Sequence, residues 1–295
     1  MLNYDLLTAR ITAWAESNAD IRAALILGSR ARSDHPADAW SDLDVLIFAR
    51  HPEQFIQSAE WAAALAPHWL TFVERPGGEA WERRTLYEGG LDVDVVFNPA
   101  EWLDGMASGQ APGAAPGIPP DFADMIRRGV KILLDKDGKL TPIVQGPLPE
   151  TTLFQKPSEA EFVNAVSDFW YHTLWSVKHL RRGELWWAKS CVDMYLKGHL
   201  QRMLECHARA AKGDQFDTWL RGRFLEEWAD PRAVEQLRGV FAQYAAPDVA
   251  RALRATMELY RWLEDETAAR WSYTCPLEGE RLAALAAIRL MEEMD

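Results

Sequence analysis

The spacing of hydrophobic and polar residues divides the chain into two parts with different periodicities. In the first part, short apolar runs with strand character alternate with stretches in which apolar residues recur at helical spacing. We expect strands over residues 21–27, 43–48, 69–73 and 91–97, and helices over residues 6–15, 52–65 and 121–134. This alternation predicts a mixed-sheet α/β domain.

From Ser158 onward the periodicity is helical. Ser158 and Glu161 form a capping-box pattern, and Gly183 marks the end of the helix that follows them. Further helices are expected over residues 184–211, 216–228, 231–244, 247–271 and 277–294. The sequence therefore predicts an α+β protein, with a mixed-sheet α/β domain over residues 1–147 and an α-helical bundle over residues 148–295.

Two stretches break the pattern of helices and strands. Glycine and proline residues crowd residues 105–120, and a loop of this length inside a compact domain is usually functional or mobile. Pro147, Pro149 and Pro157 bound the segment that we interpret as the interdomain linker.

Composition narrows the class of protein. The 295 residues are 48% hydrophobic, which is enough for one large or two medium cores. The acidic N-terminus lacks a signal-peptide pattern, the apolar runs are too short to span a bilayer, and the three cysteines have no disulfide or metal-ligand spacing. We expect a protein of the reducing cytoplasm that does not associate with a membrane.

The chain carries a net charge of −12. A negative charge of this size repels polyanions and attracts cations, so it argues against a nucleic-acid partner and suits a small cationic ligand. An acidic composition also serves solubility. The 14 tryptophans are also numerous for this length. Core packing explains most of them, while a few in Trp170-Tyr171, Trp175 and Trp186-Trp187 are candidates to line a ligand cleft.

Three aspartates in the first part form the main candidate site. Asp42 and Asp44 open an apolar strand, and residues two apart in a strand point to the same side. Two such carboxylates repel each other unless a divalent cation lies between them, and Mg²⁺ suits oxygen ligands of this kind. For an isolated pair, a solvated strand start is the alternative.

Asp94 strengthens this hypothesis, because it lies inside the apolar strand Leu91–Phe97, where a bare carboxylate is costly. If that strand lies beside residues 43–48, Asp94 reaches the same ion. Asp92 shares its face and is expected either near the site or at the surface beside the turn.

A small-residue turn precedes the aspartates. Gly28, Ser29 and Arg30 follow the first expected strand, where a helix is expected to start. Small residues there let backbone N–H groups approach a phosphate, and the helix dipole favours negative charge. The alternative is an ordinary strand-to-helix turn.

Together these motifs resemble the nucleotidyltransferase superfamily that includes DNA polymerase β. The stretch 37–45 is similar, more narrowly, to the aminoglycoside 6-adenylyltransferases, which modify streptomycin. Residues 168–171, 177–178 and 182–189 are similar to the paired helices of that family. The chain departs from the family at Cys206-His207, where a Trp-His pair is usual, and this departure bears on the acceptor more than on the chemistry.

The resemblance implies in-line attack by an acceptor hydroxyl on the α-phosphate of ATP, with Mg²⁺ present and pyrophosphate leaving. Asp42 and Asp44 would ligate the metal that binds the triphosphate, and Asp94 would complete a second site or take the hydroxyl proton. Gly28 and Ser29 would hold phosphates, with Arg30 as a weaker candidate.

The resemblance also draws attention to the helical part. Related enzymes contact the nucleotide phosphates with a lysine from this region, so Lys189 is a candidate, with an i,i+4 ion pair to Asp193 as the alternative. Asp168 and Glu184 are candidate contacts to a cationic acceptor, or else structural residues. The histidines of the helices show no metal-ligand pattern and receive no role.

The leading hypothesis is adenylylation of an aminoglycoside, with streptomycin as the first acceptor to test. Transfer to another small molecule or to a protein is the alternative within the same chemistry. A non-catalytic nucleotide-binding protein of the same fold is disfavoured, since such a protein has no chemical need for all three aspartates.

Overall fold

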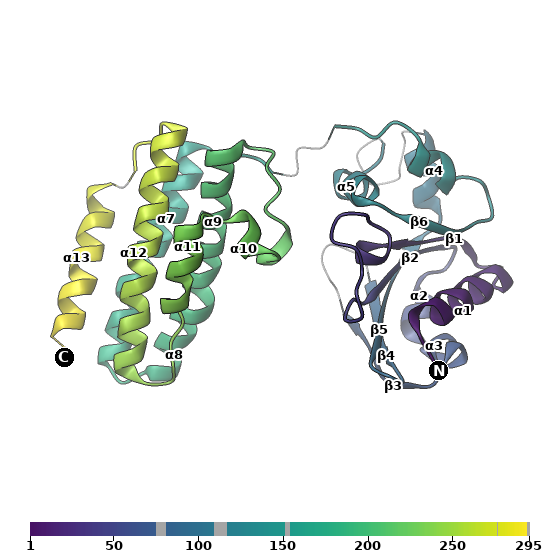
Figure 1. The fold of residues 1–295 in the computed structure, drawn as a ribbon, viewed down its shortest axis with the longest axis horizontal. Coiled ribbons are helices and arrows are strands. Elements are labelled where there is room, and N and C mark those ends of the chain that lie inside the picture. The colour runs from purple at the N-terminus through teal and green to yellow at the C-terminus, as the bar shows by residue number, and fades with distance from the viewer. Residues whose placement is uncertain (75–80, 109–116, 151–153, 276, 294–295) are drawn as a thin grey trace. The chain divides into compact units, whose positions relative to one another are not determined.

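One mixed sheet of six strands, in the order β3-β4-β5-β2-β1-β6, organises the N-terminal part of the chain. The computed structural model of the chain describes residues 1–74, 81–108, 117–150, 154–275 and 277–293. The chain separates into two compact units, Met1–Leu153 and Phe154–Asp295 (Figure 1). Unit 1 holds the sheet with its helices, and the elements described in unit 2 are helices, so the predicted α+β class is confirmed.

The elements of unit 1 alternate along the chain. The strands are β1 (Ile21–Leu27), β2 (Leu43–Ala49), β3 (His68–Glu74), β4 (Trp81–Tyr87), β5 (Leu91–Pro99) and β6 (Lys131–Asp135). The helices are α1 (Tyr4–Ser17), α2 (Glu53–Gln57), α3 (Glu60–Leu65), α4 (Glu101–Ser108), α5 (Pro120–Arg128) and α6 (Leu140–Gln145), and a short 3₁₀ turn covers Gly28–Arg30.

Both faces of the central strands are buried. In β2, Leu43 and Val45 enter a core with α1, α2 and α3, whereas Leu46 and Phe48 enter a second core with α4, α5 and α6. Strands covered on both faces are near-continuous apolar runs, which explains the composition of β2. β2 and β5 pair in parallel, and all the other neighbouring strands are antiparallel.

The structure corrects several predicted elements of unit 1. The helix expected over 52–65 is split into α2 and α3, and the helix expected over 121–134 ends at Arg128. Gly129 follows with a φ of +115°, where a Cβ would come within 2.8 Å of the Ala31 carbonyl oxygen. Residues 131–135 then pair with β1 as β6 instead of continuing the helix.

Strand β4 is missing from the prediction because its charged interior, Glu82, Arg83 and Arg84, hides the apolar alternation. The Gly- and Pro-rich stretch 105–120 begins inside α4, and its central residues 109–116 lie outside the described part of the chain.

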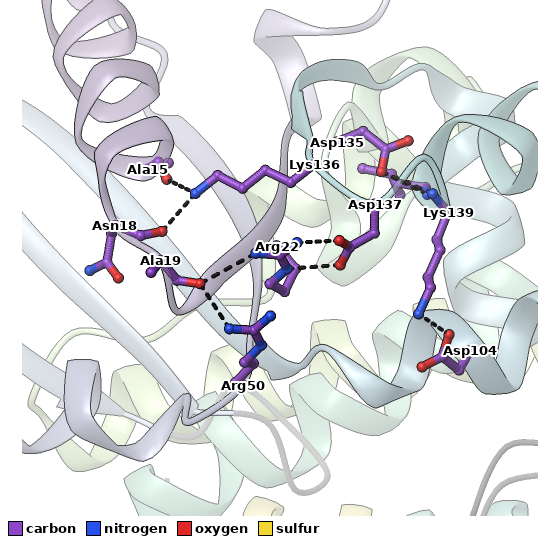
Figure 2. A network of polar contacts seen from close by, with 11 residues as sticks. Ala15, Asn18, Ala19, Arg22, Arg50, Asp104, Asp135, Lys136, Asp137 and Lys139 are labelled. Carbon is purple, nitrogen blue, oxygen red and sulfur yellow. Dashed lines mark hydrogen bonds and ion pairs between the residues drawn. The ribbon is translucent and has the colours of Figure 1, made fainter.

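A polar network ties the ends of several elements together at the edge of the sheet where β2 ends (Figure 2). Lys136 Nζ donates to the carbonyls of Ala15 and Asn18 at the end of α1, at 2.8 and 2.6 Å. Arg22 at the start of β1 pairs with Asp137. Because cations at a helix C-terminus meet unpaired carbonyls, this network anchors β6 against α1.

The network also fixes the start of α6. Asp135 accepts hydrogen bonds from the backbone N–H groups of Lys139, Leu140 and Thr141, at 3.0, 3.2 and 2.8 Å. Lys139 pairs in turn with Asp104 of α4. The ends of β1 and β2 that carry this network lie away from Gly28 and Asp44, because β1 finishes where β2 begins.

Unit 2 is a bundle whose long helices are α7 (Glu159–Arg181), α9 (Leu196–Lys212), α12 (Ala246–Trp271) and α13 (Glu278–Glu292). Shorter elements are α8 (Leu185–Ser190), the π-helical turn η2 (Cys191–Tyr195), α10 (Leu225–Trp228) and α11 (Pro231–Gln236). The helix expected over 216–228 is helical only in the 3₁₀ turn Leu220–Gly222 and in α10. The helix expected over 231–244 is helical only in α11 and in the 3₁₀ turn Leu237–Gly239. No helix in the described part of the chain is long and apolar enough to cross a bilayer.

The predicted ends of the first long helix are confirmed. Ser158 Oγ accepts from the Glu161 N–H, and Glu161 Oε2 accepts from the Ser158 N–H at 2.8 Å, which completes the capping box. Gly183 follows α7 with a φ of +77°. These local signals were readable because a helix end satisfies its backbone groups with nearby residues.

A carboxyl group at the centre of this bundle links stability to pH. Glu264 of α12 is fully buried and accepts a hydrogen bond from Trp170 Nε1 of α7 at 2.9 Å. Burial is the main cause that raises the pKa of Glu264 to about 7, with Asp265 and Glu280 acting in the same direction. The folded state therefore holds this proton at a pH where the unfolded chain has released it.

We predict that the unfolding free energy falls as the pH rises from about 4.5 to about 7, because this contribution is complete below the unfolded pKa. Glu264→Gln should reduce the difference in unfolding free energy between pH 5 and pH 8 by roughly 1–3 kcal/mol. Urea denaturation at both pH values measures this difference. Glu258→Gln on the exposed face of α12 is the matched control, and equal effects of the two variants would contradict the prediction.

Candidate active site

The three predicted aspartates meet at one end of two neighbouring strands. Asp44 of β2 and Asp94 of β5 are register partners in the parallel pair, and Asp42 directly precedes β2. One carboxylate oxygen from each lies within 4.8 Å of the others. Side chains two residues apart share a face, so the strand geometry directs all three carboxylates to one point.

The buried member of this cluster is Asp94, which is 8% exposed. Burial, opposed by the Arg84 guanidinium and reinforced by the neighbouring Glu82 and Asp44, raises the pKa of Asp94 to about 7. Gathering three carboxylates in a half-buried place is unfavourable without positive charge. Three oxygen donors at this spacing suit a hard divalent cation such as Mg²⁺, so the residues fit the metal that the sequence predicted.

Two further charged residues face this cluster from β4. Arg84 is the register partner of Asp94, and its Nη1 lies 3.5 Å from Asp94 Oδ2. The same guanidinium reaches Glu82 Oε1 at 3.1 Å and Glu74 Oε1 at 3.0 Å. Sequence analysis missed Glu82 and Arg84, although their spacing of two residues is the signal that places both on one face of a strand.

Gly28 allows the backbone to approach the aspartates closely. It ends β1 with a φ of +71°, which favours glycine, and a Cβ at this position would overlap Asp44 Oδ2. A residue with any side chain would therefore displace the Asp44 carboxylate or the turn itself.

Ser29 presents an unpaired hydroxyl beside this turn. Its Oγ is buried and has no hydrogen-bond partner among the described residues, although a buried hydroxyl is costly when unpaired. The backbone of Ser29 is held by the Ala37 N–H, which donates to the Ser29 carbonyl at 2.9 Å. The hydroxyl therefore lies beside the turn without a hydrogen-bond partner among the described residues, and its contact with a phosphate stays a prediction.

Arg30 is engaged by the protein itself. Its Nε donates to the Asp42 carbonyl at 2.7 Å, its Nη2 donates to the Ser41 carbonyl at 2.6 Å, and its guanidinium lies 3.5 Å from the centre of the Tyr4 ring. In this position Arg30 fixes the backbone that carries Asp42. Asp92 accepts from Tyr4 Oη at 2.9 Å and is exposed, as expected for a position beside the turn.

The candidates of the helical part lie in unit 2. Lys189 of α8 forms an ion pair with Asp193, which is the alternative weighed from the sequence, and the second oxygen of Asp193 is buried without a partner among the described residues. Asp168 accepts from Tyr195 Oη at 2.9 Å, and Glu184 pairs with His179 and Arg182.

We predict that Gly28→Ala weakens Mn²⁺ binding by at least about tenfold, because the new methyl group displaces the Asp44 carboxylate. Gly90→Ala is the matched control: Gly90 also has a positive φ, of +76°, but open space around its Cβ position. Each substitution should cost roughly 1–2 kcal/mol of stability. Titration calorimetry with Mn²⁺ tests the difference, and equal Mn²⁺ affinities in the two variants would contradict the role given to Gly28.

Comparison with known proteins gives matches over most of the chain. The family model for streptomycin adenylyltransferase matches residues 1–284. An aminoglycoside 6-adenylyltransferase of Campylobacter jejuni is 22% identical over 280 residues, covering 92% of this chain and 90% of the relative. Another, of Bacillus subtilis, is 22% identical over 248 residues, covering 82% of this chain and 81% of the relative.

A crystal structure of an aminoglycoside 6-adenyltransferase from Bacillus subtilis aligns with 98% of this chain and 99% of its own, at 17% identity and a TM-score of 0.45. The family resemblance predicted from the sequence is thus confirmed by a match over most of the chain. The chain belongs to the streptomycin adenylyltransferase family of nucleotidyltransferases.

Proposed function

We propose that this protein transfers AMP from ATP to a hydroxyl group of an aminoglycoside, with streptomycin as the leading acceptor, and releases pyrophosphate. The observation that carries the proposal is the meeting of Asp42, Asp44 and Asp94 at one end of β2 and β5. The description of the matching family and the names of the relatives support the acceptor class.

The carboxylates have distinct parts in the proposed reaction. Asp42, Asp44 and Asp94 would together hold Mg²⁺ ions, which when bound polarise the attacking and leaving oxygens of the displacement. Asp94 would alternatively accept the hydroxyl proton, since it is the carboxylate of the cluster that lies inside a buried strand. Arg84 holds Asp94 from the side of β4.

The turn after β1 is suited to the triphosphate. Ser29 Oγ would donate to a phosphate oxygen, and Gly28 permits the turn to lie against Asp44. Arg30 supports this arrangement indirectly by fixing the backbone at Ser41 and Asp42. These residues bind and orient the donor so that its α-phosphorus faces the acceptor, which is the main protein contribution in phosphoryl-type transfer.

Charge favours the proposed acceptor. The net charge of −12 attracts a polycation and disfavours a nucleic acid as the acceptor. The three cysteines are free thiols, in keeping with a cytoplasmic enzyme that meets the drug inside the cell.

The test is pyrophosphate release from Mg-ATP in the presence of a panel of aminoglycosides and other hydroxylated antibiotics. Release with streptomycin is the expected result. Release with other acceptors alone would retain the chemistry and overturn the choice of acceptor. ATP binding without turnover on any member of the panel would instead favour a non-catalytic nucleotide-binding protein.

In the same assay we predict that Asp42→Asn and Asp44→Asn each lower turnover at least about a thousandfold, because the amide cannot replace a metal-binding carboxylate. Circular dichroism and melting temperature should stay close to those of the unmodified protein, since Asp42 and Asp44 lie at the partly exposed strand start. A folded double variant with near-normal turnover would overturn the assignment of these residues.

Lys189 is proposed to contact the nucleotide phosphates, and its ion pair with Asp193 makes a control possible. We predict that Lys189→Ala raises the KM for ATP by about tenfold, since a cation beside the phosphates is lost. Asp193→Asn breaks the same ion pair and keeps the lysine. If both variants change the KM for ATP equally, the lysine serves the ion pair alone.

A further inference from the structure

Three arginines of unit 1, Arg30, Arg83 and Arg84, are held by different kinds of partner. Arg30 is fixed by two backbone carbonyls and by the face of the Tyr4 ring. Arg83 is buried, and it donates to two carbonyls of α2 on the face of β4 opposite Arg84. Arg84 instead forms its ion pairs with carboxylates, and one of these belongs to Asp94 of the candidate active site.

The carboxylates around Arg84 come from three neighbouring strands. Arg84 Nη1 lies 3.5 Å from Asp94 Oδ2 of β5, and its Nε lies 3.1 Å from Glu82 Oε1 of β4 and 3.0 Å from Glu74 Oε1 of β3. The register of the strands gathers them, because Glu74 pairs with Glu82 and Arg84 pairs with Asp94. One guanidinium therefore offsets only part of the negative charge around it.

Asp94 is thus a partner for two different cations. It belongs to the three aspartates whose oxygens lie within 4.8 Å of one another and suit Mg²⁺, and it also faces the Arg84 guanidinium. Since like charges repel, a guanidinium beside a carboxylate lowers the affinity of that carboxylate for a second cation. Groups that support a metal ligand are usually carboxylates, carbonyls or water, which strengthen the ligand as an electron donor. Arg84 has the opposite charge and the opposite effect.

Arg84 can also give up Asp94 without losing all its partners. Its contact with Asp94 is the longest of the three ion pairs, and the contacts with Glu82 and Glu74 remain when that one is broken. The Arg84 side chain is 39% exposed, whereas the Asp94 side chain is 10% exposed, so the arginine has room to shift and the aspartate does not. Arg30, which is bound to fixed backbone carbonyls, has no such alternative.

We propose that Arg84 is a built-in counter-ion that competes with a divalent cation for Asp94. The inference rests on the metal-binding role that the proposed function gives to the three aspartates. It adds that the metal position beside Asp94 is weaker than the position between Asp42 and Asp44, and that it fills when a nucleotide brings further negative charge. Arg84 thereby couples binding of the second ion to the arrival of the nucleotide.

Four variants separate charge from structure. Arg84→Gln removes the charge and keeps a hydrogen-bond donor, whereas Arg84→Lys keeps the charge. Arg84→Met keeps the aliphatic part of the side chain and carries the same prediction as Arg84→Gln, so loss of folding in one of them leaves the test intact.

Arg50→Gln is the matched control, because it makes the same change of charge at the far end of β2. Arg50 donates to the Ala19 carbonyl at 3.4 Å in the polar network of Figure 2. It lies roughly 20 Å along the strand from Asp44, which is about twice the distance over which salt screens a charge.

Titration calorimetry with Mn²⁺ on the full chain without nucleotide is the test. Arg84→Gln and Arg84→Met should bind Mn²⁺ at least about fivefold more tightly than the unmodified protein, while Arg84→Lys and Arg50→Gln should differ from it by less than about twofold. Adding α,β-methylene-ATP should raise the Mn²⁺ bound by the unmodified protein from about one ion to about two. Arg84→Gln should bind about two without the nucleotide analogue.

The opposite sign would overturn the inference. Weaker Mn²⁺ binding in Arg84→Gln, restored in Arg84→Lys, would make Arg84 a residue that orients Asp94 as a ligand, and the proposed function would stand. Equal Mn²⁺ affinities in all variants would also exclude competition.

Two further outcomes concern the proposed function itself. A lack of Mn²⁺ binding in the unmodified protein and in every Arg84 variant, with and without the nucleotide analogue, would overturn both the inference and the metal role of the aspartates. The expected Mn²⁺ affinities in a chain that adenylylates no aminoglycoside would retain the inference and overturn the choice of acceptor.

Discussion

The parallel pairing of β2 with β5 is the constraint on which the rest of the site depends. It makes Asp44 and Asp94 register partners although 50 residues separate them in the sequence, and it brings Asp42 to the same strand end. Both strands are buried on both faces, so their register cannot slip without moving apolar residues out of two cores at once. The hydrophobic cores of unit 1 thereby hold mutually repelling carboxylates in place, with Gly28 permitting the turn after β1 to lie against them.

The same geometry explains the electrostatics. The three carboxylates repel one another, and the repulsion is strong because Asp94 is buried. Arg84, on the neighbouring strand β4, offsets part of this repulsion. In the proposed reaction a divalent cation would relieve the remaining repulsion and would bring the phosphates of the nucleotide with it. The mutual repulsion of these carboxylates lowers the stability of the fold. Such a local cost is expected at a functional site, where the surrounding fold compensates for it.

Unit 2 shows a second departure of this kind. Its core is a single cluster of buried apolar residues, and its buried carboxyl group, Glu264, accepts a hydrogen bond from Trp170. Around η2, by contrast, aromatic side chains remain exposed beside Asp168. The π-helical turn and these aromatic side chains line one cavity within unit 2.

The sequence by itself determined the fold class, most of the long elements and the three aspartates, because period-two spacing and helix-end signals are local properties of the chain. It missed β4, with Glu82 and Arg84, because a charged strand interior is stable only beside the partners that the sheet supplies. It also extended a helix through residues that form β6, since pairing with β1 overrides local propensity. Only the tertiary structure decided that Arg30 supports the backbone at Asp42, that Ser29 keeps an unpaired hydroxyl, and that aromatic residues of three consecutive elements enclose one cavity. Each of these outcomes depends on contacts between residues that the order of the chain does not bring together.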